Sequence, residues 1–329
     1  MIKRALLALG TAAILASPVP ADDAAPSANS NQPPPHTLPF PNLATGENRE
    51  EVRASLELGP QMQRGISAAQ LLEQRRRLDT ALASIKPQRP GIVDAYVLTI
   101  ALDSDPVFAR EAREAGRVLS ARYDGEGRTL TLAGPDGMRN DLPHGSIDAL
   151  IVSLARIAEV MDPDEDVLVL YSTSHGLDLG LAYHYGDTGY GILSPARFKS
   201  VLEEVGIERR ILMLSACYSG VFIPALTSPN TAILTAAADN RTSFGCEAEN
   251  DWTFFGDALI NRALRKPQSL SDASRAAGRS VAEWEAERRL LASLPQTVIG
   301  NDVADWLPEL EARMPEVASA PVGRPAAGE

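Results

Sequence analysis

The sequence predicts an α/β fold in which a mostly parallel β-sheet lies between two layers of helices. Short apolar runs alternate along the chain with segments whose apolar residues recur at helical spacing. Each run is too short for a helix and ends in small residues or glycine, which is typical of a buried strand. Because the runs are apolar almost throughout, both faces of the sheet must be covered. Alternation with helices favours parallel strands.

The expected elements follow one another in chain order. Ser146 is expected to cap one helix, and Pro195 to occupy the first position of another. Helices are expected at residues 66–85, 107–122, 146–161, 194–205, 252–263 and 270–294. Strands are expected at 92–102, 129–133 and 231–236, and in the runs that begin at Val167 and Ile211. An extended piece at 295–300 is a candidate for addition to a sheet edge.

The two ends of the chain lack this pattern. Residues 1–21 join Lys3 and Arg4 to an apolar run and then to small residues before Ala21, as in a secretory signal peptide. The apolar run is too short to span a bilayer, and an uncleaved anchor is the alternative. Residues 22–55, which are rich in Pro and Ala and include His36, predict a disordered linker with no part in catalysis. A helical segment at 56–90, a main domain at 91–312 and a disordered tail at 313–329 complete the expected organisation.

Composition and charge exclude some partners. The chain has 329 residues and a net charge of −12, and its Arg-rich pieces lie among glutamates. Without a basic patch, nucleic acid is not an expected partner. No stretch after the signal peptide is apolar enough for a stable membrane span. Together with the signal peptide, this predicts an exported protein that is periplasmic or secreted.

A thiol and an imidazole stand at equivalent strand ends. His175 follows the run 167–173, and Cys217 follows the run 211–215. If the two strands are neighbours, both side chains face one crevice at the carboxyl edge of the sheet. An imidazole activates a thiol as a nucleophile, and Gly176 and the small neighbours of Cys217 would let backbone N–H groups point at a developing oxyanion. The pattern therefore predicts acyl transfer.

Other interpretations of these residues stay open at this stage. Cys217 and Cys246 could form a disulfide in an oxidising compartment, which would consume the nucleophile. His175 and Cys217 could also be ordinary core residues. No second His or carboxylate stands at ligand spacing near Cys217, so no metal and no cofactor are expected. His184 is expected to be exposed, and Asp178 to orient the loop after His175.

The motifs resemble those of a known superfamily. Ser-His-Gly at 174–176 and Ala-Cys-Tyr-Ser-Gly at 216–220 place His175 and Cys217 at 217 − 175 = 42 positions apart. This pattern is similar to that of the caspase/legumain cysteine peptidases, and most similar to bacterial members of the legumain family, which includes the GPI transamidase catalytic subunit. The similarity extends from about residue 91 to 300 and includes 241–246. The resemblance implies a mostly parallel six-stranded sheet, a Cys217–His175 dyad, and Gly176 and Cys217 amides as the oxyanion hole.

The same resemblance suggests substrate-binding residues. Legumain has an acidic residue two positions before its nucleophile, whereas this chain has Ser215, so a preference for cleavage after Asn is not expected to carry over. Arg110 matches the position of a pocket arginine, with a solvated helix face as the alternative. Ser243 is expected to line the same pocket. Arg241 is a further candidate for binding an acidic side chain, with a surface salt bridge as the alternative.

The sequence thus predicts an exported cysteine endopeptidase that acts on polypeptides through an acyl-enzyme. A transamidase or ligase would use the same site, because the reaction differs only in whether water or an amine reaches the thioester. A non-catalytic binding or scaffold protein that retains the fold is the rival class.

Overall fold

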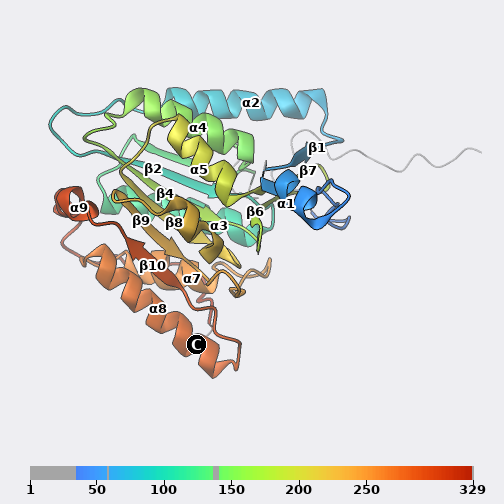
Figure 1. Cartoon of the computed structure of the whole chain (residues 1–329). Helices are drawn as coiled ribbons and strands as arrows, with labels where there is room; N and C mark the ends of the chain where they lie inside the picture. Colours follow the sequence, from blue (N-terminus) through green and yellow to red (C-terminus); the bar gives the residue numbers. More distant parts are fainter. Residues whose placement is uncertain (1–34, 58, 136–140, 328–329) are drawn as a thin grey trace, which may run out of the picture. The chain divides into compact units, whose positions relative to one another are not determined.

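The computed structural model describes residues 35–57, 59–135 and 141–327. Its main sheet has six strands in the order β10-β9-β8-β4-β2-β3, and all neighbouring pairs are parallel except β10 with β9. The predicted mostly parallel six-stranded sheet is confirmed (Figure 1). The strands are β2 (Ala95–Ala101), β3 (Thr129–Leu132), β4 (Val167–Thr173), β8 (Arg210–Ser215), β9 (Thr231–Thr235) and β10 (Gln296–Ile299).

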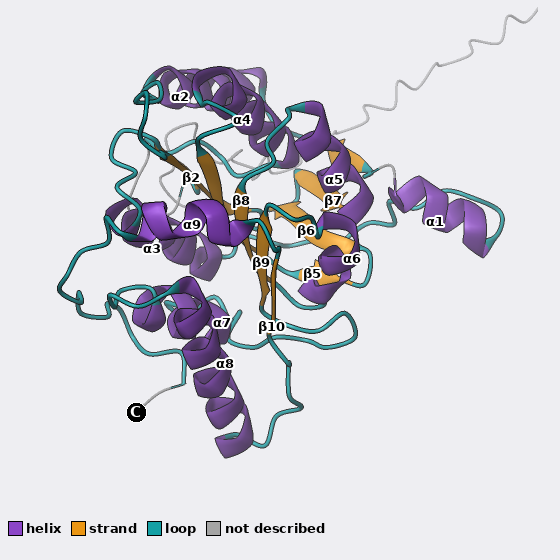
Figure 2. Ribbon diagram, turned by 60° about the vertical axis from the view of Figure 1, so that its left-hand side comes forward, coloured by secondary structure: helices purple, strands orange, loops and turns teal. Residues whose placement is uncertain are grey.

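Helices cover both faces of this sheet, as predicted. On one face lie α2 (Ala68–Ala83), α4 (Ile147–Val160) and α5 (Pro195–Glu204), and on the other lie α3 (Pro106–Arg122), α8 (Leu270–Glu287) and α9 (Val303–Glu311) (Figure 2). Successive strand residues alternate between the two cores: Val169 packs with the α3 and α8 side, whereas Leu168 and Leu170 pack with the α4 and α5 side. This alternation explains why the strand sequences are apolar at nearly every position.

The helix boundaries follow local signals that the sequence contains. Ser67 caps α2 in a capping box with Gln70, and Ser146 caps α4 by accepting a hydrogen bond from the Ala149 N–H. Pro195 occupies the first turn of α5, as expected. The helical segment expected at 252–263 consists of the short helix α7 (Phe254–Gly256) followed by a π-helical stretch, η2 (Asp257–Ala263).

A second, four-stranded sheet was not predicted. It has the order β1-β7-β6-β5, formed by β1 (Gln61–Gln63), β5 (Gly176–Leu177), β6 (Gly180–Tyr185) and β7 (Gly189–Leu193). The glycines in this stretch suggest a loop, yet β6 and β7 form an antiparallel hairpin over five residue pairs. The hairpin follows His175 directly, so it brings β6 alongside the carboxyl end of β2.

The ends of the described chain differ from the prediction. Most of helix α1 (Arg49–Glu57) lies in the stretch 22–55 that was expected to be a disordered linker, and its buried Leu56 lies just beyond that stretch. In the tail expected to be disordered, Val322 O accepts a hydrogen bond from Trp252 Nε1 at 2.8 Å, and Ala326 N donates to Asp257 Oδ2 at 2.9 Å. The tail is held because it covers buried polar groups of α7 and η2. The predicted signal peptide lies outside the described residues.

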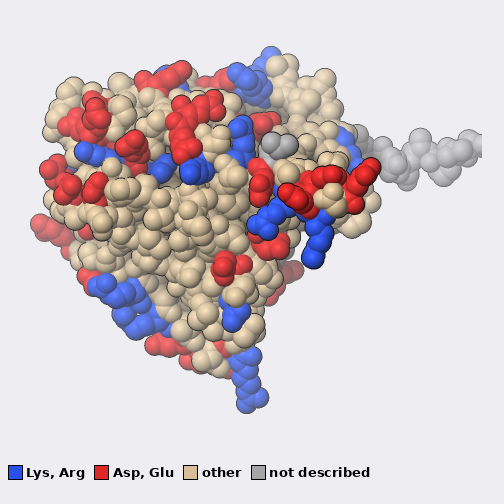
Figure 3. All heavy atoms as spheres, viewed as in Figure 1, with Lys and Arg blue, Asp and Glu red and all other residues tan. Residues whose placement is uncertain are grey.

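Two observations concern the surface and the membrane. On the face shown in Figure 3, Lys and Arg side chains lie among Asp and Glu side chains around a broad uncharged area. None of the helices in the described part of the chain is long and apolar enough to cross a membrane.

Candidate active site

The strands that precede His175 and Cys217 are neighbours in the sheet. β4 pairs with β8 in parallel, and the last pair in register is Thr173 with Ser215. His175 and Cys217 each lie two residues beyond this pair, so both side chains leave the sheet at the same edge and at the same height. The Ser174 N–H continues the ladder by donating to Ser215 O at 3.2 Å. The condition that the sequence analysis set, that the two strands are neighbours, is thus met.

Gly176 permits the two loops to approach each other. A Cβ atom at this position would lie 2.0 Å from the Cys217 carbonyl oxygen and 3.0 Å from the Ala216 Cβ. No side chain fits in that space, so the backbone of the His175 loop rests directly on the backbone of the Cys217 loop. The requirement for glycine here comes from this contact.

Three neighbours surround the imidazole of His175. Its Nε2 lies 3.5 Å from Asp105 Oδ2, and Phe108 packs edge-on against the ring with centroids 5.1 Å apart. Cys246 is the third neighbour. Burial acts to lower the pKa of His175, but hydrogen bonds to Asp105 and Cys246, together with the charge of Asp103, outweigh burial and raise it to about 10. The ring is therefore an imidazolium at neutral pH.

Asp105 is a residue of the site that the sequence reasoning missed. It occupies the N-cap position of α3, directly before Pro106, but its carboxylate makes no capping hydrogen bond. An N-cap aspartate ordinarily accepts a bond from the first turn, which contributes about 1 kcal/mol. Here the carboxylate faces His175 instead, and the hydrogen bond to His175 lowers the pKa of Asp105. The signal available in the sequence was an acidic residue just after the carboxyl end of a buried strand, β2.

The thiol of Cys217 is half-buried and contacts Ser243. Ser243 N donates to Cys217 Sγ at 3.2 Å, and Ser243 Oγ lies 3.6 Å from the same sulfur. Both cysteines are free thiols in the structure. The structure therefore does not contain the Cys217–Cys246 disulfide that the sequence left open. The residue after Cys217, Tyr218, has φ of +57°, a strained conformation for a non-glycine residue. It turns the chain sharply from β8 into the short helix η1 (Ser219–Phe222).

Of the three predicted substrate-binding residues, Ser243 alone is seen to touch the thiol. Arg110 lies on α3, where its guanidinium donates to Ala248 O at 2.6 Å and pairs with Asp251 at 3.3 Å. It thus fastens the loop 246–251, rather than forming the solvated helix face that was the alternative. The Arg241 guanidinium donates hydrogen bonds to the neighbouring Asn240. The backbone carbonyl of Arg241 accepts a hydrogen bond from the Tyr218 N–H.

Ser215 is only 2% exposed and belongs to a polar network beneath the site. Its hydroxyl lies 3.1 Å from Thr253 Oγ1, and Thr253 N donates to Glu111 Oε2 at 2.7 Å. Tyr171 OH donates to the other oxygen of the same carboxyl group at 2.5 Å. Burial raises the pKa of Glu111, while the donors that face it act in the opposite direction. Ser215 therefore has a partner inside the protein.

The structure corrects the expectation for His184 and His36. His184 was expected to be exposed, but its side chain is 13% exposed and its ring stacks on that of His36 at a centroid distance of 3.4 Å. His36 was assigned to a linker away from the site, yet its Nε2 lies 2.9 Å from Asp103 Oδ1. Asp178 is exposed, and Cys246 packs against the small apolar cluster that includes Phe108.

Two groups of potential metal ligands overlap at this edge of the sheet. One consists of His36, Asp103 and His184, and the other of Asp103, Asp105 and His175, with the donor atoms of each group within 4.8 Å of one another. The sequence reasoning looked for ligand spacing near Cys217 only. Apart from Asp103 and Asp105, the residues of these groups are far apart in the chain, so local spacing does not reveal the groups.

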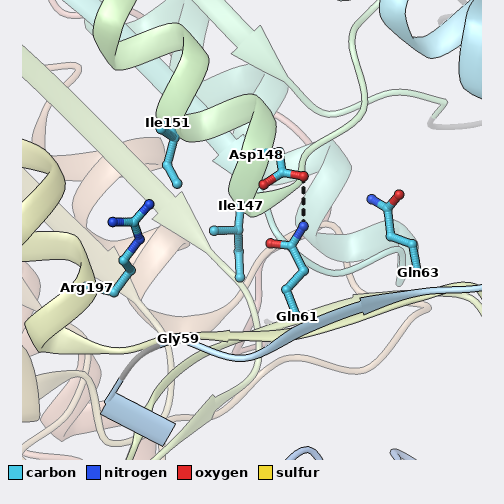
Figure 4. A pocket seen from close by; sticks show the side chains of 7 residues that line it. All are labelled: Gly59, Gln61, Gln63, Ile147, Asp148, Ile151 and Arg197. Atoms are coloured by element: carbon cyan, nitrogen blue, oxygen red, sulfur yellow. Dashed lines mark hydrogen bonds between the residues drawn. The ribbon is translucent and has the colours of Figure 1, made fainter. Parts of the chain in front are cut away.

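A hollow of about 500 Å³ lies elsewhere in the molecule. It is lined by Gly59 and Gln61 beside β1, by Asp148 at the start of α4 and by Arg197 of α5, among others, and Gln61 Nε2 donates to Asp148 at 2.8 Å (Figure 4). It shares no lining residue with the His175 and Cys217 loops, and its lining holds no nucleophile or acid–base pair. We therefore assign the chemistry to the strand ends and not to this hollow.

A mostly parallel sheet with a histidine and a cysteine just beyond the ends of adjacent central strands is the arrangement that the resemblance to caspase/legumain peptidases implies. Residues 148–304 match the Peptidase C13 family, the legumain family. The match supports the predicted relation to legumain-like proteins over this part of the chain.

The comparison with solved structures finds caspase-1 from Spodoptera frugiperda. That chain is 15% identical, with a TM-score of 0.42, and the similarity covers 65% of this chain and 88% of the caspase. A comparison with curated proteins finds no match.

Proposed function

We propose that this protein is an exported cysteine endopeptidase in which Cys217 is the nucleophile and His175 its proton-transfer partner. The observation that supports the proposal most strongly is the register of β4 and β8, which puts both residues two positions beyond a paired Thr173 and Ser215. The Peptidase C13 match and the free thiol of Cys217 support it as well. Export rests on the charged, apolar and small-residue pattern of residues 1–21.

The chemistry follows from the protonation states. With His175 held as an imidazolium, the Cys217 thiolate attacks the peptide carbonyl carbon and forms a tetrahedral oxyanion, which the N–H groups of Gly176 and Cys217 would stabilise. The C–N bond then breaks as His175 gives its proton to the leaving amine, and a thioester remains. Water attacks the thioester and gives a proton back to His175, which releases the carboxylic acid and regenerates the thiolate. Asp105 keeps the imidazole charged and oriented.

Active-site labelling tests the proposal. The probe is a peptidyl acyloxymethyl ketone, offered with Asn, Asp, Arg or Lys next to the reactive group, and the labelled residue is identified by peptide mass mapping. We expect labelling of wild type and loss of labelling in Cys217→Ala. Cys246→Ser is the matched control, because Cys246 is the second cysteine of the chain and lies beside His175; it should keep the label on Cys217.

Two results would contradict the assignment. Equal labelling of wild type and Cys217→Ala would show that Cys217 is not the residue that reacts with the probe. A label found on Cys246 in the wild-type protein would move the nucleophile to the other thiol. The preferred residue of the probe reports the substrate class, to which Ser243 is expected to contribute through its contact with the thiol.

A further inference from the structure

The geometry points to a transition-metal site, separate from the catalytic dyad, in which His36, Asp103 and His184 bind one divalent cation such as Zn²⁺. The three residues come from different parts of the chain: the segment before α1, the end of β2, and β6. Their donor atoms lie within 4.8 Å of one another. This inference does not depend on peptidase activity.

The backbone holds two of the ligands in place. Asp103 and His184 form a parallel bridge at the point where β6 passes the end of β2. His184 N donates to Leu102 O at 3.0 Å, and Ser104 N donates to His184 O at 2.9 Å. The two side chains are therefore fixed by regular backbone bonds on either side, as expected for residues that must keep a coordination geometry.

Two buried polar atoms point to a missing partner. Asp103 has a side chain with 0% exposure, and its Oδ2 has no hydrogen-bond donor within the described ranges; the nearest ring nitrogen, His184 Nδ1, is 3.9 Å away. His184 Nε2 is likewise buried and without a hydrogen bond. A buried carboxylate oxygen without a donor is costly, and a cation would satisfy it.

His36 has the arrangement of a metal-binding histidine. Its Nδ1 lies 3.3 Å from Gly186 O, so an N–H on Nδ1 donates to that carbonyl and leaves Nε2 as the free donor atom. That Nε2 faces Asp103 Oδ1 at 2.9 Å and Asp105 Oδ1 at 3.6 Å. Thr37 and Leu38 anchor the same segment by donating backbone N–H groups to Asp187 at 2.9 and 2.8 Å.

The donor set favours a borderline transition metal over Mg²⁺ or Ca²⁺. Two imidazoles and one carboxylate suit Zn²⁺ with an open fourth position, whereas Mg²⁺ and Ca²⁺ prefer oxygen ligands. Bond lengths near 2.0–2.1 Å require tetrahedral ligand atoms about 3.3 Å apart. The stacked rings must tilt for their lone pairs to converge. His36 lies outside any helix or strand, so its ring can tilt about the hydrogen bond to Gly186 O without disturbing a ladder of backbone hydrogen bonds.

The competing explanation is a charged His36 that pairs with Asp103 without any metal. A hydrogen bond at 2.9 Å fits an imidazolium donor equally well. The two explanations differ in a measurable way, because the ion pair predicts no dependence of Zn²⁺ affinity on His36.

Zn²⁺ titration of the metal-free protein by calorimetry tests the site. We expect one Zn²⁺ per chain, and an affinity at least about tenfold weaker in His36→Ala and in His184→Gln, because each removes a ligand. Thr37→Ala is the matched control: it loses the side-chain contact of the same segment with Asp187 but no ligand, and should bind as wild type does. Mg²⁺ alone should give no comparable binding. Circular dichroism checks that each variant is folded.

A second measurement tests whether either cysteine thiol takes part in metal binding. Co²⁺ replaces Zn²⁺ as a spectroscopic probe, and Cys217→Ala and Cys246→Ser are titrated beside wild type. The proposal requires unchanged affinity in both variants and no thiolate-to-cobalt charge-transfer band. It is overturned if His36→Ala binds Zn²⁺ as tightly as wild type, or if either cysteine variant loses the ion.

Discussion

At the scale of single residues, the imidazole of His175 interacts with a carboxylate that sequence motifs did not reveal. Asp105 stands where a helix cap is expected, and its neighbour Pro106 supports that local interpretation. The structure instead turns the carboxylate toward His175 at 3.5 Å, while Phe108 packs on the ring. Asp105 is thus a positioning residue, whose effect is exerted through His175.

Replacement of Asp105 by Asn tests that role. Loss of its charge lowers the pKa of His175, so the imidazolium form and the proton for the leaving amine are lost at a lower pH. We expect kcat/KM for a peptide amide substrate to fall by about 10- to 100-fold, and the alkaline decline of the pH profile to move to lower pH. Asp178→Asn, which removes an exposed carboxylate from the loop after His175, is the control. An unchanged alkaline decline in Asp105→Asn would mean that the carboxylate does not act on His175.

At the scale of elements, strand register brings the chemistry together. β2, β4 and β8 are adjacent, with Ala101 paired to Thr173 and Thr173 paired to Ser215. Side chains that follow these three residues at short, matched intervals must converge at one edge. Beneath them, the Glu111 carboxyl ties α3 to β4 and to the start of α7 through Tyr171 and Thr253. The network fixes the floor of the site.

The contact between the β5 and β8 loops is tested by Gly176→Ala. The added methyl group would meet the Cys217 carbonyl at 2.0 Å, so the loops must separate. We expect a loss of about 1–3 kcal/mol in the free energy of unfolding and a larger relative loss of activity, measured by urea denaturation and by probe labelling. Gly278→Ala in α8 is the control, since a Cβ there meets nothing within 4 Å; it should stabilise by about 0.5–1 kcal/mol. Equal effects of the two substitutions would refute the steric argument.

At the scale of the whole molecule, two histidines affect how the free energy of unfolding depends on pH, one at acid pH and the other at alkaline pH. His144 is buried against Tyr185, with ring centroids 3.8 Å apart, and burial lowers its pKa to about 3. The unfolded chain binds a proton at this histidine near pH 6.5, so its contribution to stability is lost as pH falls from 6.5 toward 3. His175 has a raised pKa, so its contribution is present below pH 6.5 and is lost as pH rises toward 10.

Urea unfolding between pH 4 and 10 tests both limits. We expect His144→Phe to flatten the acid decline of the unfolding free energy and to leave the alkaline side as in wild type. His175→Gln should do the reverse and flatten the alkaline decline. If each variant changes the opposite side, or if neither changes the slope, the assignment of these pKa shifts to the two histidines is wrong.

The sequence by itself determined the mostly parallel sheet and its helical layers, and it identified His175 and Cys217 as the candidate pair, because these depend on local patterns. Apolar runs define strands, periodic segments define helices, and a side chain just beyond a parallel strand must lie at the carboxyl edge. The prediction failed for β6 and β7, where glycines suggested a loop, and for the tail, which buried polar groups hold in place.

Only the tertiary structure shows which residues surround His175 and Cys217. His36 lies 67 residues from Asp103, and His184 lies 184 − 103 = 81 residues from it, yet all three meet at the end of β2. No local rule connects residues at such distances, since their meeting depends on the path of the β6–β7 hairpin and of the segment before α1. For the same reason Ser215, expected to bind substrate, was found bonded to Thr253 below the site. The local sequence pattern identifies the candidate reactive residues, and the tertiary fold determines which residues surround them.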